Sequence, residues 1–114
     1  MEISRGDVIL VNLDPVIGSE QGKIRPALII QNDISNRYSP ITIVAPITTK
    51  MYSKKFPTNV EIDSTNSPLK EKSTILFNQI RTIDKQRIVK IYGKISNNKL
   101  KEANKAIKNS LELD

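Results

Sequence analysis

The sequence predicts a mainly β fold: a curled, barrel-like antiparallel sheet with one C-terminal amphipathic helix and short helical turns. Short β-branched runs recur between Val8 and Ile95, and turn-forming residues separate them. After these runs, apolar residues recur at helical spacing, at Leu100, Ala103, Ile107 and Leu111. A chain of 114 residues suits one domain, residues 1–114, with a single modest core.

The first half of the chain predicts two strands and a helical turn. Residues 8–13 are mostly apolar and β-branched, and Asp14-Pro15 ends the run with a turn signal. The loop 16–24 holds two of the four glycines. Residues 27–31 have the apolar character of a buried strand. In the polar stretch 32–36, side chains can cap a short helical turn.

The second half predicts four more strands and the terminal helix. Pro46, within the predicted strand 41–49, cannot donate a ladder hydrogen bond, so we expect an edge or a bulge there. Ser96 or Asn97 is expected to cap the helix. The remaining predicted segments are a basic loop at 50–57, strands at 59–62, 74–80 and 88–95, a polar connector at 64–72 and a turn at 84–87.

Composition limits the chemistry. Eighteen Lys and Arg against twelve Asp and Glu give a net charge of +6, which favours a polyanion such as nucleic acid, although scattered surface lysines would give the same total. The chain has no cysteine and no histidine. Disulfides, thiol nucleophiles and the common zinc ligands are therefore excluded, and we expect no metal and no cofactor. Catalysis would depend on Arg, Lys, hydroxyls, amides and carboxylates.

The sequence also favours a cytoplasmic protein. Residues 1–10 lack the charged-then-apolar order of a signal peptide. The longest apolar runs, such as 8–11 and 27–30, are too short to cross a bilayer, so we expect no membrane association. The absence of cysteine agrees with a reducing compartment.

Arg25 is the first candidate for catalysis. It stands at the start of an apolar run and is followed by Pro26. Its guanidinium is planar, always charged and offers paired donors that match phosphate oxygens. The alternative is an arginine that bridges a surface carboxylate. Thr48 and Thr49 end a predicted strand, where a hydroxyl can donate to phosphate or where the residues simply fill strand positions.

The loop before Arg25 supplies the next candidates. Glu20 could accept a proton in a positive environment, or it is an ordinary solvated carboxylate. Its neighbours Ser19 and Gln21 could hydrogen-bond bases or phosphates, with the same ambiguity.

Two further segments combine the residue types that bind RNA. The loop 50–57 interleaves basic and aromatic side chains that could attract a backbone and stack on unpaired bases, or it is a solvated loop pinned by Phe56. Gln79 and Arg81 would point to one side of an ideal strand, to read RNA or to close a network at a subunit contact. The candidates in the loop are Lys50, Tyr52, Lys54 and Phe56.

A series of motifs extends over nearly the whole chain in a specific order. The motifs are Arg5-Gly6-Asp7-Val8, Gly18-Ser19-Glu20-Gln21-Gly22 followed by Arg25-Pro26, Ile30-Gln31-Asn32-Asp33, Ser39-Pro40 with Ile47-Thr48, Pro57-Thr58-Asn59-Val60-Glu61-Ile62, and Gln79-Ile80-Arg81-Thr82-Ile83-Asp84-Lys85-Gln86-Arg87. In these motifs the chain resembles the MazF/PemK family of toxin endoribonucleases.

The resemblance implies a small barrel-like sheet of the SH3-like, PemK type, a homodimer, and cleavage of single-stranded RNA, including mRNA, at short sequences. It implies a MazE-like antitoxin whose flexible tail blocks the RNA groove. It assigns the catalytic pair to Arg25 and Thr48, a loop acid to Glu20 and a groove contact to Gln79. Asn32, within the third motif, is a further expected RNA contact. Relatives often carry an acid where this chain has Asn78, so no acid–base role is expected there.

The expected reaction needs no metal, because RNA carries its own nucleophile in the 2′-hydroxyl. Attack on the adjacent phosphate leaves a 2′,3′-cyclic phosphate and a 5′-hydroxyl. Arg25 is too basic to accept a proton, so its role would be electrostatic. Two alternatives remain open at this point: a toxin of the same fold that poisons DNA gyrase, and a nucleic-acid-binding module without catalysis.

Overall fold

The computed structural model describes residues 2–113, which form strands, two α-helices and two 3₁₀ turns. In chain order the elements are β1 (Asp7–Asn12), β2 (Ile24–Ile29), α1 (Asp33–Tyr38), β3 (Ile41–Thr48), β4 (Asn59–Ile62), β5 (Ser73–Leu76), η1 (Phe77–Gln79), β6 (Arg81–Asp84), η2 (Lys85–Arg87), β7 (Ile88–Lys94) and α2 (Asn97–Leu111). No helix in this part of the chain is both long enough and apolar enough to cross a membrane.

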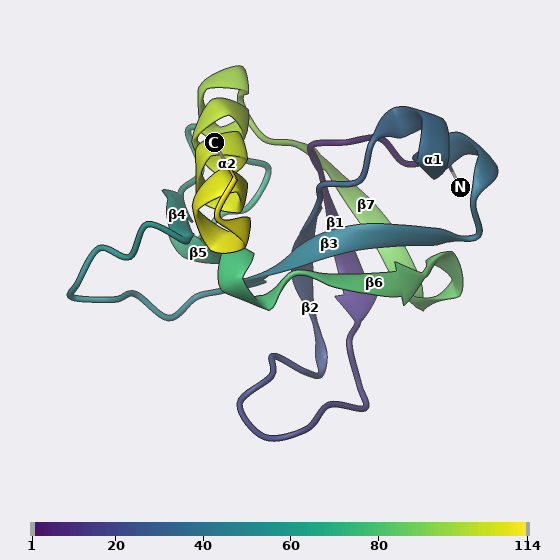
Figure 1. Ribbon diagram of the computed structural model, residues 1–114, viewed down its shortest axis with the longest axis horizontal. Coiled ribbons are helices and arrows are strands. Elements are labelled where there is room, and N and C mark those ends of the chain that lie inside the picture. The colour runs from purple at the N-terminus through teal and green to yellow at the C-terminus, as the bar shows by residue number, and fades with distance from the viewer. Residues whose placement is uncertain (1, 114) are drawn as a thin grey trace.

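The strands form one curled antiparallel sheet around the long strand β3 (Figure 1). One edge of β3 pairs with β2, followed by β1 and β7. Along its other edge, residues 41–44 pair with β6 and residues 47–48 pair with β5, which continues to β4. The prediction of a mainly β fold with a curled antiparallel sheet and a C-terminal helix is confirmed. The barrel does not close, because the sheet path ends at β4 and at β7.

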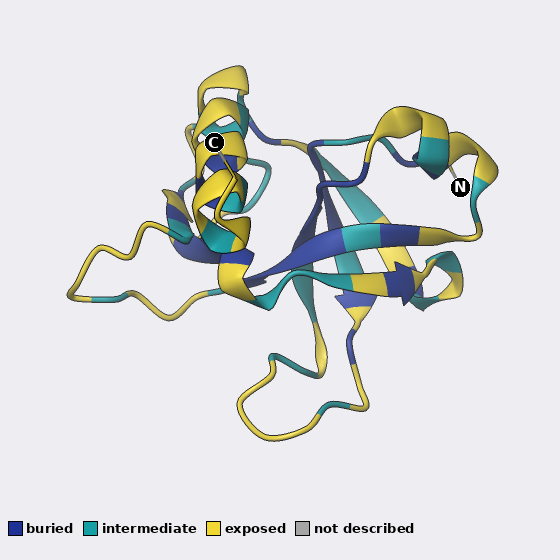
Figure 2. Ribbon diagram, in the orientation of Figure 1, coloured by how far each residue is buried: buried dark blue, intermediate teal, exposed yellow. Residues whose placement is uncertain are grey.

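Each face of the sheet carries a hydrophobic core, because successive side chains of a strand point to opposite faces. The inward face of α2 covers one of them, as the buried stripe in Figure 2 shows. Ser96 caps that helix by accepting from the Lys99 amide. The core under α2 includes Val8, Leu28, Ala45, Ile47, Ile75, Phe77, Ala103 and Ala106. The core on the other face includes Ile9, Val11, Leu13, Ala27, Ile29, Val44, Ile83 and Ile88.

Two sequence-based boundaries were wrong. The expected strand 74–80 ends at Leu76, and a 3₁₀ turn over Phe77–Gln79 follows. The strand β6 was not predicted, since residues 81–83 were assigned to no element and Asp84 was placed in the turn 84–87. Only Ile83 of its four residues is buried, so no apolar run marks it in the sequence.

Pro46 lies in the interior of the sheet, so the expected edge or bulge is wrong. It pairs with Ala27 of β2. Ile43 accepts from the Ile30 amide on the β2 side. Because backbone groups alternate along a strand, the backbone of Pro46 faces the other edge of β3. There it falls between the residues paired with β6 and those paired with β5, where no ladder bond is required.

Asp33, in the first turn of α1, accepts hydrogen bonds that predict an acid-sensitive contribution to the stability of the folded protein. Asp33 Oδ1 accepts from the Arg5 amide at 2.7 Å and from Asn36 Nδ2 at 3.3 Å. The Arg5 hydrogen bond, with help from Asn36, lowers the pKa of Asp33 below its ordinary value of 3.8. A lowered folded-state pKa gives stability that is present above the unfolded-state pKa and is lost as pH falls.

We therefore expect Asp33→Asn to be less stable than the wild type at pH 7, with a difference that shrinks below about pH 4. Urea denaturation of both proteins at pH 7 and at pH 3 measures this. An equal difference in unfolding free energy at the two pH values would contradict it.

Candidate active site

The loop between β1 and β2 is folded back on itself. The Leu13 amide donates to Lys23 O at 2.9 Å, and the Lys23 amide donates to Asp14 Oδ1 at 2.7 Å. A Cβ on Gly22 would lie 2.6 Å from Asp14 Oδ1 and 2.7 Å from Val16 Cγ2. A larger residue at position 22 would therefore require the side chains of Asp14 and Val16 to move.

Three arginines from different strands and turns hold the base of this loop. Arg25 Nε donates to Gly22 O at 2.7 Å, and Arg81 Nη1 donates to Leu13 O at 2.9 Å. Arg87 Nη1 donates to Asn12 O at 3.2 Å and also to Asp14 O. Each guanidinium keeps further N–H donors, since a guanidinium has five. The end of the β1–β2 hairpin is therefore rich in positive charge.

The register of the sheet relates Arg25 to Thr48. The ladder between β2 and β3 ends at the pair Ala27 and Pro46, and the same register continued by two residues along each strand would set Arg25 opposite Thr48. Both are half-buried and extend the face that carries Ala27 and Val44. Thr48 Oγ1 accepts from the Lys50 amide at 3.2 Å, which leaves its hydroxyl proton for another acceptor.

A groove of about 590 Å³ opens between this loop and the segment that joins β5 to β6. The Gln21 amide donates to Gln79 Oε1 at 2.8 Å and links the two sides. The Ile17 amide donates to Glu20 Oε1 at 2.7 Å within the loop. The lining residues are Pro15, Val16, Ile17, Ser19, Glu20, Gln21, Asn78, Gln79, Ile80 and Arg81.

The groove continues toward the loop between β3 and β4. A smaller hollow of about 170 Å³ shares Asn78 and Gln79 with the groove and is also lined by Tyr52 and Phe56. These two rings meet edge to face, with centroids 6.0 Å apart. Lys50 Nζ lies 5.0 Å from the centre of the Tyr52 ring. Basic and aromatic side chains thus line a path that begins beside the β1–β2 loop.

The sequence matches, over residues 4–111, the family described as PemK-like, MazF-like toxin of type II toxin-antitoxin system. The chain belongs to this toxin family. It is 52% identical over 109 residues to endoribonuclease MazF of Staphylococcus saprophyticus, covering 96% of this chain and 91% of that protein. It is 47% identical over 113 residues to endoribonuclease EndoA of Bacillus subtilis, covering 99% and 97%. The predictions of a MazF-like toxin and of an endoribonuclease are confirmed.

Solved structures of MazF proteins share the fold. MazF of Deinococcus radiodurans superposes with a TM-score of 0.84 at 21% identity and covers 99% of both chains. An endoribonuclease in complex with its cognate antitoxin from a mycobacterial species gives a TM-score of 0.81 at 22% identity, covering 98% of this chain and 97% of that one. The MazF-like fold is therefore established by structure as well as by sequence.

Most of the residues predicted for this MazF-like toxin lie on the connected hollows or beside them. Ser19, Glu20, Gln21, Gln79 and Arg81 line the large groove. Gln79 and Arg81 reach it from a 3₁₀ turn and the start of β6 rather than from one ideal strand. Lys54 lines a third hollow beyond Tyr52 and Phe56. Thr49 and Lys50 are exposed directly after Thr48.

Asn32 does not lie with the other candidates. It caps α1 by accepting from the Ser35 amide at 2.8 Å, at the opposite end of β2 from Arg25. Sequence reasoning missed Asn78, Ile80 and the apolar side of the loop, Val16 and Ile17, all of which line the groove. In a sequence, apolar residues such as Val16 and Ile17 look the same as core residues. The structure distinguishes Ile17 from a core residue by its exposure of 84%.

Proposed function

We propose that this chain is the toxin of a toxin–antitoxin pair and that it cleaves single-stranded RNA at short sequences without a metal ion. The observation that best supports the proposal is the register of β2 and β3, which when continued beyond Ala27 and Pro46 brings Arg25 opposite Thr48, near the groove that Arg81 lines and the hollow that Tyr52 and Phe56 line. The absence of His and Cys from the chain agrees with chemistry that depends on the substrate's own nucleophile.

In this mechanism the 2′-oxygen attacks the adjacent phosphorus and loses its proton, and the bond to the 5′-oxygen breaks. The products are a 2′,3′-cyclic phosphate and a 5′-hydroxyl, whose oxygen takes up a proton from water. Arg25 stabilises the additional negative charge on the phosphoryl oxygens in the transition state. The Thr48 hydroxyl donates a hydrogen bond to one of these oxygens. Glu20 accepts the 2′-proton.

The groove and its continuation would hold the RNA on both sides of the scissile phosphate. Ser19, Gln21, Gln79 and Arg81 supply polar contacts, while Lys50 and Lys54 attract the backbone. Tyr52 and Phe56 offer faces on which bases stack. Thr49, which is exposed directly after Thr48, completes the set of proposed RNA contacts.

The proposal includes three properties of the protein in the cell. It acts as a homodimer, it is inhibited by a MazE-like antitoxin whose flexible tail occupies the groove, and it works in the cytoplasm, where mRNA is available. Solved toxins of this fold that are bound to their antitoxins support the second property.

Incubation of the purified protein with a long natural RNA in excess EDTA tests the activity. We expect full cleavage at a small set of sites, with cut positions mapped by primer extension. The 5′ fragments should end in a cyclic phosphate and the 3′ fragments should begin with a 5′-hydroxyl. Loss of activity that Mg²⁺ restores would contradict the mechanism. RNA that is bound but remains intact would favour the module without catalysis, and intact RNA with inhibition of gyrase would favour the gyrase poison.

A further inference from the structure

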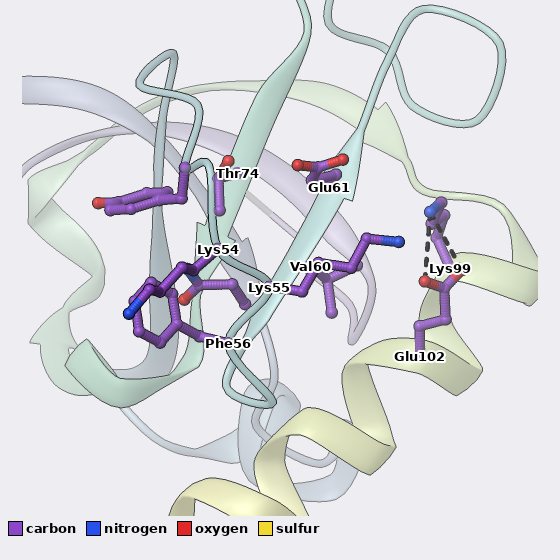
Figure 3. Close-up of a pocket in the computed structure, with 10 residues that line it drawn as sticks. Lys54, Lys55, Phe56, Val60, Glu61, Thr74, Lys99 and Glu102 are labelled. Atoms are coloured by element: carbon purple, nitrogen blue, oxygen red, sulfur yellow. Dashed lines mark hydrogen bonds and ion pairs between the residues drawn. The ribbon is translucent and has the colours of Figure 1, made fainter.

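A third hollow continues the path beyond the aromatic loop and reaches α2 (Figure 3). Its volume is about 260 Å³, and it shares Tyr52, Phe56 and Asn59 with the 170 Å³ hollow beside Gln79. Pockets that enclose whole small molecules occupy about 300–1,000 Å³, so this one suits a single planar ring. Each hollow shares lining residues with the next, so the three follow one another from the β1–β2 loop to α2.

The outer face of the β4–β5 hairpin forms the floor of this hollow. Val60 and Ile62 of β4 are buried on the α2 side, so Asn59 and Glu61 face away from that core. Thr74 pairs with Glu61, and its hydroxyl donates to Lys50 O at 3.0 Å. The β3–β4 loop is thereby tied over the hairpin.

The carboxylate of Glu61 lines this hollow and, in the part of the chain that the structure describes, forms no ion pair. Lys54, Lys55 and Lys99 make the hollow basic, and Lys99 Nζ lies 3.1 Å from the carboxylate of Glu102. Figure 3 shows Glu61 on its strand between Thr74 and the Lys99–Glu102 pair. Within residues 2–113, the Glu61 carboxylate makes no ion pair and no hydrogen bond.

A carboxylate repels phosphate, so its position in a groove for a polyanion is unfavourable unless it accepts hydrogen bonds from a base. Cytosine presents N4–H₂, adenine presents N6–H₂, and guanine presents N1–H and N2–H₂ to such an acceptor. Uracil offers only one ring N–H, and two carbonyl oxygens that repel the carboxylate flank it. Tyr52 and Phe56 supply the apolar surface on which the base stacks.

We propose that this hollow is a base-selective subsite in which Glu61 accepts a hydrogen bond from an RNA base with an exocyclic amine and disfavours uracil. The inference rests on the proposed ribonuclease function and assigns a specificity-determining residue to it. The 170 Å³ hollow lies between this subsite and the large groove, so the bound base lies near the scissile phosphate but not at it.

The test uses a set of short RNAs that share the mapped cleavage site and carry each of the four bases at every flanking position. The wild type should cleave the uracil substrate about tenfold more slowly at one of these positions. Glu61→Gln keeps the size of the side chain but adds an amide donor for a uracil carbonyl. It should reduce that preference to within about twofold and leave preferences elsewhere unchanged.

Glu71→Gln is the matched control, because it removes the same charge from an exposed position that lines none of these hollows. Its cleavage profile should match the wild type. A Glu61→Gln profile identical to the wild type at every position would overturn the inference while the ribonuclease function stands.

Binding separates the two failures. If the wild type cleaves none of the RNAs, the proposed function is wrong. No cleavage site can be mapped in that case, so binding of short single-stranded RNAs that differ only in the base at one position is compared by fluorescence anisotropy. A base preference in binding that Glu61→Gln removes and Glu71→Gln retains would support the subsite, and equal effects of the two variants would overturn it.

Discussion

Arg25→Ala should lower the rate of RNA cleavage by at least about 10² while the fold persists. The proposed role of Arg25 is to stabilise charge that is greater in the transition state than in the substrate, so the loss should appear in kcat more than in KM. Single-turnover cleavage of a labelled RNA measures the rate, and circular dichroism monitors the fold. Cleavage within tenfold of the wild type would remove Arg25 from the mechanism.

Two further variants test whether the loss of activity is specific to Arg25 and shared with Thr48. Arg37→Ala removes an exposed arginine of α1 and should leave the rate unchanged. Thr48→Val should also slow cleavage. If the two side chains act on one phosphoryl group, the double variant will be little slower than Arg25→Ala alone. Fully multiplicative effects would indicate that they act separately.

Much of the fold could be predicted because hydrophobic patterns report burial. The runs 8–13, 27–31 and 41–49 supply both cores, and each forms a strand, although β2 begins three residues before its apolar run, at Ile24. The helical spacing of Ala103 and Ile107 predicted α2, whose inward face is buried. Ser96 or Asn97 was expected to cap this helix, and the Ser96 hydroxyl does so.

The remainder depends on contacts between distant residues, which a local pattern does not contain. Phe77 is apolar and resembles strand continuation, yet the chain turns there and carries Gln79 to the groove. The position of Arg25 relative to Thr48 depends on the register between β2 and β3. Only the assembled sheet defines that register. Asn32 occurs in a recognisable motif, but its side chain caps a helix away from the groove.

Phe77→Ala should lower the free energy of unfolding by about 3–5 kcal/mol. Phe77 is fully buried in the core under α2, and its amide donates to Thr58 O at 2.9 Å. Removal of the ring leaves a cavity that neighbouring strands cannot fill, because they are held by ladder bonds. Urea denaturation followed by circular dichroism measures the loss. A decrease below about 1 kcal/mol would show that the ring is not packed as described.

Phe56→Ala is the matched control, since Phe56 and Phe77 are the two phenylalanines of the chain. The Phe56 side chain is 46% exposed and lies beside Tyr52 on the groove, so its loss should change stability by no more than about 0.5 kcal/mol. It should instead weaken RNA binding, because a stacking surface is removed. The same substitution at the two positions therefore separates packing from recognition: one variant should lose stability, and the other should lose affinity for RNA.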